Sequence, residues 1–253
     1  MKVKKIRLPL LPVLLFVLFG TLSASAIMTT AEEKGVRFDG LAEYKTEAVD
    51  MPLPLTYEAT VRFPTGFNGN GGVIFGSYSA DTASAINLEV CSGGLLRLYI
   101  IDGSLVKHDI VFDGVNVYNG LQNHIAITLD REAGAYICYV NGEVAQVVAA
   151  AIPEDFTLNS KLVLGGDNVA GNPGYFRGEL FGVALYSDVR NSSEISSDAT
   201  SAAVDTSELI AAYAPLDSGN ENSSITAIGD AKYNMTYKCD WIKDVPDPVY
   251  KTK

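Results

Sequence analysis

The 253-residue sequence has little cysteine, histidine or tryptophan: three, two and one residue respectively. Cys91, Cys138 and Cys239 lie far apart and include no C-x-x-C pair, which excludes a disulfide framework and the usual zinc spacings. Cys138 lies in an alternating apolar pattern and is predicted to be a small buried hydrophobic residue. A single bridge that ties Cys239 to the rest of the chain is left open.

Basic residues are also scarce, since 19 Lys and Arg oppose 30 Asp and Glu for a formal charge of −11. Beyond the first residues, no basic cluster is available to neutralise a run of phosphates. This excludes nucleic acid as a partner and disfavours an anionic membrane surface. The simplest role of the acidity is to keep the protein soluble.

The N-terminus has the pattern of a secretory signal peptide. Basic residues between Lys2 and Arg7 precede an apolar run over residues 8–22, and Ala24-Ser25-Ala26 is a small-residue cleavage pattern. Prolines interrupt the run, whereas a membrane-spanning helix needs about 20 apolar residues. We predict a signal peptide at 1–26 and a secreted mature chain with no membrane association; the alternative is an uncleaved anchor. The mature chain carries 15 basic and 30 acidic residues, a formal charge of −15.

Between Val36 and Tyr186 the apolar residues recur with period two. In Thr56–Phe63 the odd-numbered positions are apolar and the even-numbered ones polar, which predicts a strand with one buried face. Asn141-Gly142 predicts a type I′ hairpin turn. About ten short strands with tight turns predict an all-β antiparallel sandwich or barrel. Nine further strands are expected at 72–77, 85–91, 95–101, 107–112, 123–130, 135–141, 143–149, 161–165 and 176–186.

The C-terminal part differs in composition. One helical turn is expected through Glu194-Ile195-Ser196, capped by Ser192 or Ser193. A return segment at 207–242 is expected to end in a strand at Tyr233–Trp241, and 246–253 has the composition of a tail or linker. We predict one domain over 27–245, including the return segment.

The order of the strand motifs resembles the laminin-G-like, concanavalin A-like lectin/glucanase superfamily. This resemblance implies a two-sheet antiparallel jelly-roll sandwich of the kind found as an accessory module in secreted bacterial proteins. Some bacterial members precede a metallophosphatase domain, but with only His108 and His124 here, such an enzyme would lie outside this chain. The motifs are Val36-Arg37-Phe38-Asp39-Gly40 with Tyr44, Leu55–Phe63, Gly72–Gly76, His124–Asp130, Tyr139–Gly142, Leu162–Gly166 and Tyr175–Leu180 with Val183 and Tyr186.

The sequence shows no catalytic motif. The superfamily's glucanases place paired acids on one strand, but Glu89, Glu143 and Glu179 each lack a second acid two residues away. A Gly-x-Ser-x-Gly nucleophile motif is also missing. We therefore predict that the chain is not an enzyme; the alternative is a glycosidase whose acids converge from different strands. His124 stands where relatives carry a Trp-His-His run and is predicted to be a strand residue hydrogen-bonded at a sheet surface.

Calcium accompanies many of these sandwiches, and the resemblance makes Asp39 the candidate ligand. The sequence departs from the family here, because Phe181 and Gly182 stand where relatives often have acids.

A sugar site needs an aromatic face and planar polar groups. Asn87 and Tyr99 are expected on the concave sheet. The export signal, the fold resemblance and the lack of a catalytic motif together predict a non-catalytic recognition module that binds an extracellular glycan through rim loops. The alternative is a structural or protein-interaction domain of a larger extracellular enzyme, with a surface protein as partner. The candidates expected in rim loops are Tyr78, Asp81, Asp167, Asn168, Asn172 and Tyr175.

Overall fold

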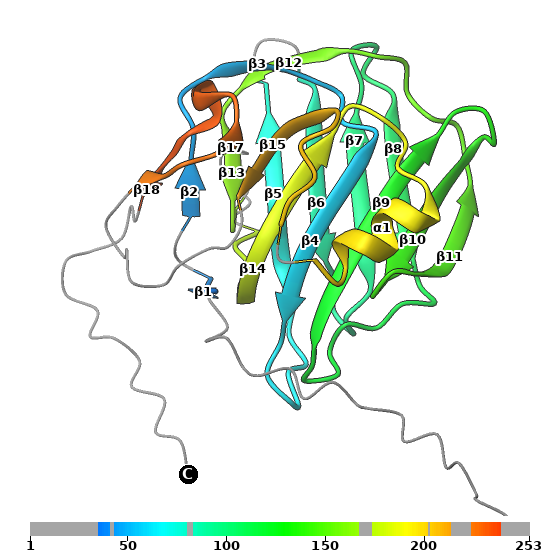
Figure 1. Cartoon of the computed structure of the whole chain (residues 1–253), viewed down its shortest axis with the longest axis vertical. Coiled ribbons are helices and arrows are strands. Elements are labelled where there is room, and N and C mark those ends of the chain that lie inside the picture. Colours follow the sequence, from blue (N-terminus) through cyan, green and yellow to red (C-terminus); the bar gives the residue numbers. More distant parts are fainter. Residues whose placement is uncertain are drawn as a thin grey trace, which may run out of the picture. The chain divides into compact units, whose positions relative to one another are not determined.

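The computed structural model describes residues 35–40, 43–79, 83–166, 174–201, 203–213 and 224–238. These residues form two eight-stranded antiparallel sheets that face one another, and a short helix, α1 (Ser192–Asp198), lies outside one of them (Figure 1). The predicted all-β antiparallel sandwich is confirmed. All ten predicted strands are present, with ends displaced by no more than one residue.

Sheet A has the strand order β11-β10-β9-β4-β14-β15-β17, and β1 also pairs with β14. The long strands β4, β9 and β14 lie at its centre. The strands are β1 (Val36–Asp39), β4 (Thr56–Arg62), β9 (Gln122–Asp130), β10 (Ala135–Val140), β11 (Glu143–Ala149), β14 (Arg177–Tyr186), β15 (Leu209–Tyr213) and β17 (Ile228–Gly229).

Sheet B has the order β16-β18-β2-β13-β5-β6-β7-β8. A separate two-stranded sheet pairs β3 (Val49–Pro52) with β12 (Thr157–Ser160). The strands of sheet B are β2 (Glu43–Lys45), β5 (Gly72–Tyr78), β6 (Ala85–Val90), β7 (Leu96–Ile101), β8 (Lys107–Phe112), β13 (Leu162–Leu164), β16 (Ser224–Ile225) and β18 (Met235–Lys238).

The core lies between the sheets, where alternation sends one side of each strand inward. In β4, Tyr57 and Val61 are fully buried and belong to the main apolar cluster. Phe63 packs at its edge against Phe176, with ring centroids 5.4 Å apart. Full burial of such side chains contributes about 1.5–3 kcal/mol each. The opposite side of each strand is therefore free of the core and forms the two outer faces of the sandwich.

The cap of α1 differs from the prediction. Asn191, rather than Ser192 or Ser193, is the N-cap, and its side chain accepts hydrogen bonds from the backbone N–H groups of Ser193 and Glu194. The Glu194 carboxylate accepts in return from the Asn191 N–H at 2.7 Å. Asn caps a helix as well as Ser does, and only a cap at 191 places the glutamate at the third helical position that this reciprocal pair requires.

The return segment extends both sheets. β15 pairs with β14 in sheet A, and β18 pairs with β2 in sheet B. The Tyr213 hydroxyl donates to the Tyr233 carbonyl at 2.8 Å, which ties the two parts together. Tyr233 itself ends a 3-10 turn, so the predicted strand begins two residues later than expected.

Several predictions about the ends of the chain stay predictions. The signal peptide at 1–26, the tail at 246–253 and Cys239 lie outside the described residues. Cys138 is buried and Cys91 half-buried, and both are free thiols. Burial raises the pKa of Cys138 to about 12. In the described part of the chain, no helix is long and apolar enough to span a membrane.

Replacing Gly72 with alanine should destabilise the fold by on the order of 3 kcal/mol or more. Gly72 has a φ of +81°, and an added Cβ would lie 2.1 Å from the backbone oxygen of Tyr175. Gly93 is the matched control, because its φ is +84° but nothing lies within 4 Å of its added Cβ. Gly93→Ala should cost only about 1–2 kcal/mol for the left-handed conformation. Urea unfolding of both variants measures the difference; equal losses would contradict the steric argument.

Candidate functional site

Two of the predicted ligand residues are neighbours on the outer face of sheet B. Asn87 in β6 and Tyr99 in β7 are direct cross-strand partners. The adjacent Leu88 and Leu98 point into the core, so alternation places Asn87 and Tyr99 on the opposite side. Such a pair has Cβ atoms about 4.5–5.5 Å apart. One side chain supplies a planar amide and the other an aromatic ring.

The surroundings of Tyr99 are polar and charge-paired. The Arg97 guanidinium lies 5.8 Å from the Tyr99 ring centroid, and its Nε donates to Glu89 at 3.0 Å. Asp109 is the partner of Tyr99 on the edge strand β8. Asn87 is 5% exposed, and its Oδ1 has no hydrogen-bond partner among the described residues. The outer face of sheet B thus places, beside a partly exposed aromatic ring, a buried amide oxygen without a hydrogen-bond partner in the described part of the chain.

Two other predicted tyrosines belong to the same sheet. Tyr78 ends β5 opposite Ala85, on the outer face, and Tyr175 forms an isolated bridge with Val73 of β5. Gly76 makes room for the Asn87 amide, because an added Cβ would lie 2.8 Å from its Oδ1. Tyr78, Asn87 and Tyr99 therefore lie in sheet B, and Tyr175 lies beside its strand β5. The other residues predicted in rim loops, Asp81, Asp167, Asn168 and Asn172, lie outside the described residues.

The described residues do not form a calcium site around Asp39. Asp39 ends β1 as an exposed residue, directly opposite Arg177. Within the described ranges, no group of three or more His, Cys, Asp or Glu side chains is close enough to share a metal ion. Calcium needs six to eight converging oxygens, and a neighbouring guanidinium opposes its charge. The residues present do not fit this ion.

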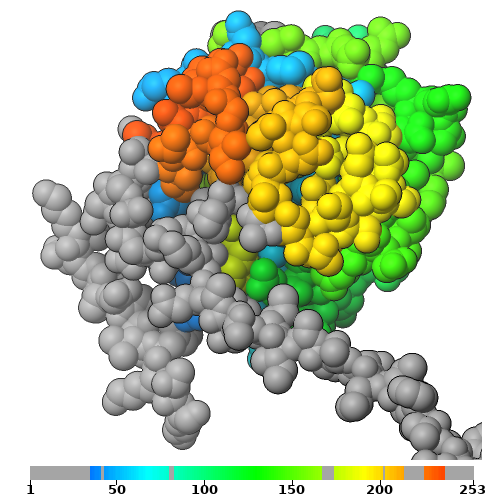
Figure 2. Space-filling model, in the orientation of Figure 1, coloured from blue at the N-terminus to red at the C-terminus, as the bar shows by residue number. Residues whose placement is uncertain are grey.

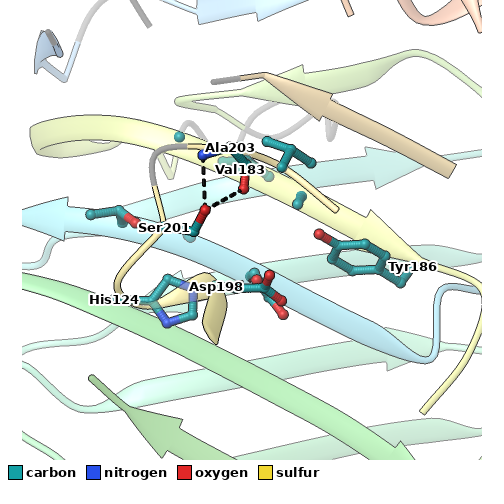
Figure 3. A pocket seen from close by; sticks show the side chains of 12 residues that line it. His124, Val183, Tyr186, Asp198, Ser201 and Ala203 are labelled. Carbon is teal, nitrogen blue, oxygen red and sulfur yellow. Dashed lines mark hydrogen bonds and ion pairs between the residues drawn. The ribbon is translucent and has the colours of Figure 1, made fainter. Parts of the chain in front are cut away.

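A second polar site lies on the outer face of sheet A, and sequence reasoning missed it. A cavity of about 90 Å³ opens between the sheet and the chain that follows β14. Its floor comes from β4, β9 and β14, and its roof from α1 with residues 201, 203 and 204. Figure 2 shows α1 and its surroundings, in yellow, covering the sheet. The lining residues are Glu58, Ala59, Thr60, His124, Gly182, Val183, Ala184, Tyr186, Asp198, Ser201, Ala203 and Val204 (Figure 3).

Arg190 organises one side of this cavity. Its side chain is 1% exposed, and its Nε donates to Asp198 at 2.9 Å and lies 3.5 Å from a Glu58 carboxylate oxygen. Its Nη2 lies 3.2 Å from Asp205, and the guanidinium lies 4.1 Å above the Tyr186 ring centroid. Burial opposes the charge, but the carboxylates of Asp198 and Asp205 raise the pKa of Arg190 above its usual value. Arg190 therefore stays charged and fastens α1 and its following loop to the sheet.

His124 lies in β9 on the outer face of sheet A and is hydrogen-bonded there, as predicted, but it is buried beneath this roof. It is 8% exposed, and its Nε2 lies 3.3 Å from the Glu58 carboxylate. Its Nδ1 has no partner among the described residues, whereas both ring nitrogens of His108 are bonded, to Asp102 and to the Ala151 carbonyl. The burial of His124 was not predicted, because strand periodicity identifies the outward side of β9 but not the segment that covers it.

Glu58 is the most unusual group of the cavity. It is 4% exposed, and its Oε1 accepts no hydrogen bond within the described residues. Burial raises the pKa of Glu58, and the opposing effects of His124 and Arg190 do not cancel the increase. The sequence did place a glutamate on the outward side of a predicted strand. It gave no sign that another segment of the chain covers this residue.

Replacing Arg190 with methionine should destabilise the fold by about 3–5 kcal/mol, because it leaves buried carboxylates without their cation. Arg131→Met is the matched control, since its ion pair with Asp155 is exposed at 35% and 79% and such pairs contribute about 0–1 kcal/mol. Urea midpoints of the two variants test this. Similar midpoints would show that Arg190 is not a stabilising centre.

Comparisons with known proteins identify solved structures of similar fold. No curated protein sequence matches this chain. A candidate carbohydrate-binding protein from Bacteroides ovatus matches with a TM-score of 0.52 and 14% identity over 81% of this chain and 58% of that one. A SAP-like pentraxin from Limulus polyphemus gives 0.49 and 14% over 66% and 82%. Domain 4 of an extracellular arabinanase from Geobacillus stearothermophilus, solved with arabinotriose, gives 0.48 and 19% over 66% and 76%.

The family model described as concanavalin A-like lectin/glucanases superfamily matches residues 41–196, more than half of the chain. This range runs from β2 to the middle of α1, so it includes Asn87 and Tyr99 and the cavity residues Glu58 and His124, whereas Asp198 and the later residues of the roof lie beyond it. The laminin-G-like resemblance read from the strand motifs is confirmed, and the chain belongs to the concanavalin A-like lectin/glucanase superfamily.

Proposed function

We propose that this chain is a secreted, non-catalytic module that binds glycans on the outer face of sheet B. The observation that carries the proposal is the cross-strand pair of Asn87 and Tyr99. An aromatic ring offers its face to the C–H surface of a sugar, and an amide offers both a donor and an acceptor to hydroxyl groups. Membership of a superfamily of lectins and glucanases supports this reading, and the N-terminal signal pattern supports export.

The charges near the pair favour a neutral sugar. A carboxylated sugar is best held by a guanidinium with free donors. Arg97, the guanidinium beside Tyr99, is already bonded to Glu89, and Asp109 adds a negative charge on the other side. The negative charge of the whole chain also slows the approach of anionic ligands.

Tyr99→Ala should weaken glycan binding by about tenfold, because the loss of one aromatic contact costs about 0.5–1.5 kcal/mol plus the buried area of the ring. Tyr99→Phe keeps the ring and should bind nearly as well as the parent. The measurement is a broad glycan array probed with the purified protein, followed by calorimetry on the best neutral ligand for each variant.

The array is run with calcium and then with a chelator. Equal binding in both is expected, because the described residues around Asp39 do not fit the ion. Loss of binding in the presence of the chelator would show that glycan binding requires calcium. An array without any hit would contradict glycan binding and favour the protein-interaction module instead.

Glycoside hydrolysis is the second candidate, because Glu58 and Asp198 line one cavity and Glu58 has a raised pKa. Glycosidases use two carboxyl groups on either side of the bond that is cleaved. Here the Arg190 guanidinium contacts both carboxylates, at 3.5 Å and 2.9 Å, where the glycosidic oxygen would have to enter. We therefore favour binding over catalysis. Release of sugar from array hits by the parent, but not by Glu58→Gln, would reverse this preference.

A further inference from the structure

We infer that the cavity between sheet A and α1 is a second binding site, for a small ligand that carries a primary ammonium group. It lies on the side of the sandwich opposite Asn87 and Tyr99, so it is separate from the proposed glycan face. The inference rests on the size of the cavity, on acceptors without hydrogen bonds, and on the balance of charge around it.

The cavity has the size of a small ligand site. Its volume of about 90 Å³ is several times the roughly 10–15 Å³ that a single water requires. Gly182 and Ala184 of β14 form part of the floor and bring little side-chain volume, and Ala203 does the same in the roof. A molecule of a few heavy atoms, or the end group of a longer one, fits this space.

The polar lining is rich in acceptors. Glu58 is 4% exposed, and its Oε1 accepts no hydrogen bond in the described part of the chain; the Arg190 Nε lies 3.5 Å from this oxygen as an ion-pair partner. His124 directs Nε2 toward the Glu58 carboxylate, which fixes the proton on that nitrogen when the ring is neutral and leaves Nδ1 as an acceptor. Asp198 adds a second carboxylate. A buried acceptor without a partner is costly, and a ligand that donates hydrogen bonds removes that cost.

The charged side chains around the cavity favour a cationic ligand. Three carboxylates, those of Glu58, Asp198 and Asp205, surround one guanidinium, that of Arg190. Together the three carboxylates and the guanidinium have an excess of two negative charges. An ammonium group supplies one positive charge and up to three donors in a compact form. Among the described residues, no group of three or more His, Cys, Asp or Glu side chains is placed so that it could hold a metal ion.

Three probes of similar size separate the ligand classes: ethanolamine as the cation, ethylene glycol as the neutral diol and glycolate as the anion. Each is titrated into the purified, isotope-labelled protein, and amide shifts are followed by NMR. Ethanolamine should shift amides of β4, β9 and β14 around the cavity, with an affinity at least tenfold above that of ethylene glycol. Glycolate should give no saturable shift. Equal affinity for the three, or a preference for glycolate, would overturn the inference.

Variants locate the site. Glu58→Gln keeps the size of the side chain, removes its charge and should lower the affinity for ethanolamine at least tenfold. Ala203→Phe changes an exposed residue at the roof and should block entry, which keeps the test decisive where Glu58→Gln fails to fold. Glu143→Gln removes an exposed charge on β11 and should bind as the parent does. Unchanged binding in both cavity variants would place the ligand elsewhere.

Acidification gives an independent readout. The groups that face Glu58 are His124 from β9, Tyr186 from β14, Asp198 from α1 and Arg190. Because burial raises the pKa of Glu58, lowering the pH should neutralise this carboxylate before ordinary glutamates, while the amine stays protonated. Ethanolamine affinity should therefore fall as pH falls, and constant affinity down to the usual range of glutamate would contradict the assignment.

Discussion

Each strand of this sandwich has two sides, and the shared core takes one of them. The alternation of Tyr57 and Val61 with Glu58 and Thr60 in β4 shows the constraint most clearly. Once the apolar side is buried, every other side chain must lie on an outer face, at a spacing fixed by the strand repeat and by the register with neighbouring strands. Both candidate sites follow from this division, since each consists of outward residues from adjacent strands.

The two outer faces are used differently. Sheet A buries its polar residues under α1 and the following loop, with Arg190 as the shared partner of acids from three parts of the chain. Sheet B keeps Tyr99 and Asp109 at least partly accessible. A covered face suits a small enclosed ligand, and an accessible one suits an extended polymer whose ends lie in solvent. The same fold thus offers two chemically distinct surfaces.

The local sequence pattern was sufficient to predict the strands, the Asn141-Gly142 turn and the outward positions of Asn87 and Tyr99. The turn has the left-handed φ values that its residues predict, +53° and +85°. Long-range contacts were not accessible in this way. The approach of Asp198 and Asp205 to Glu58 depends on where α1 lies relative to the sheet, and one sequence without its fold does not encode that distance in any local pattern. The burial of His124 was missed for the same reason, and the cap at Asn191 was missed because three adjacent residues were all good caps.

The return segment has a consequence for how the protein forms. β18 completes sheet B beside β2, although some 190 residues separate them along the chain, and β15 completes sheet A beside β14. Pairings between residues so far apart in the sequence give a high contact order. A high contact order slows folding, because the entropy cost of closing a long loop is incurred before the stabilising contacts form. During synthesis, β2 therefore has an unpaired edge until the last strand has left the ribosome. Export of the chain in an unfolded state would postpone this closure until both strands are on the same side of the membrane.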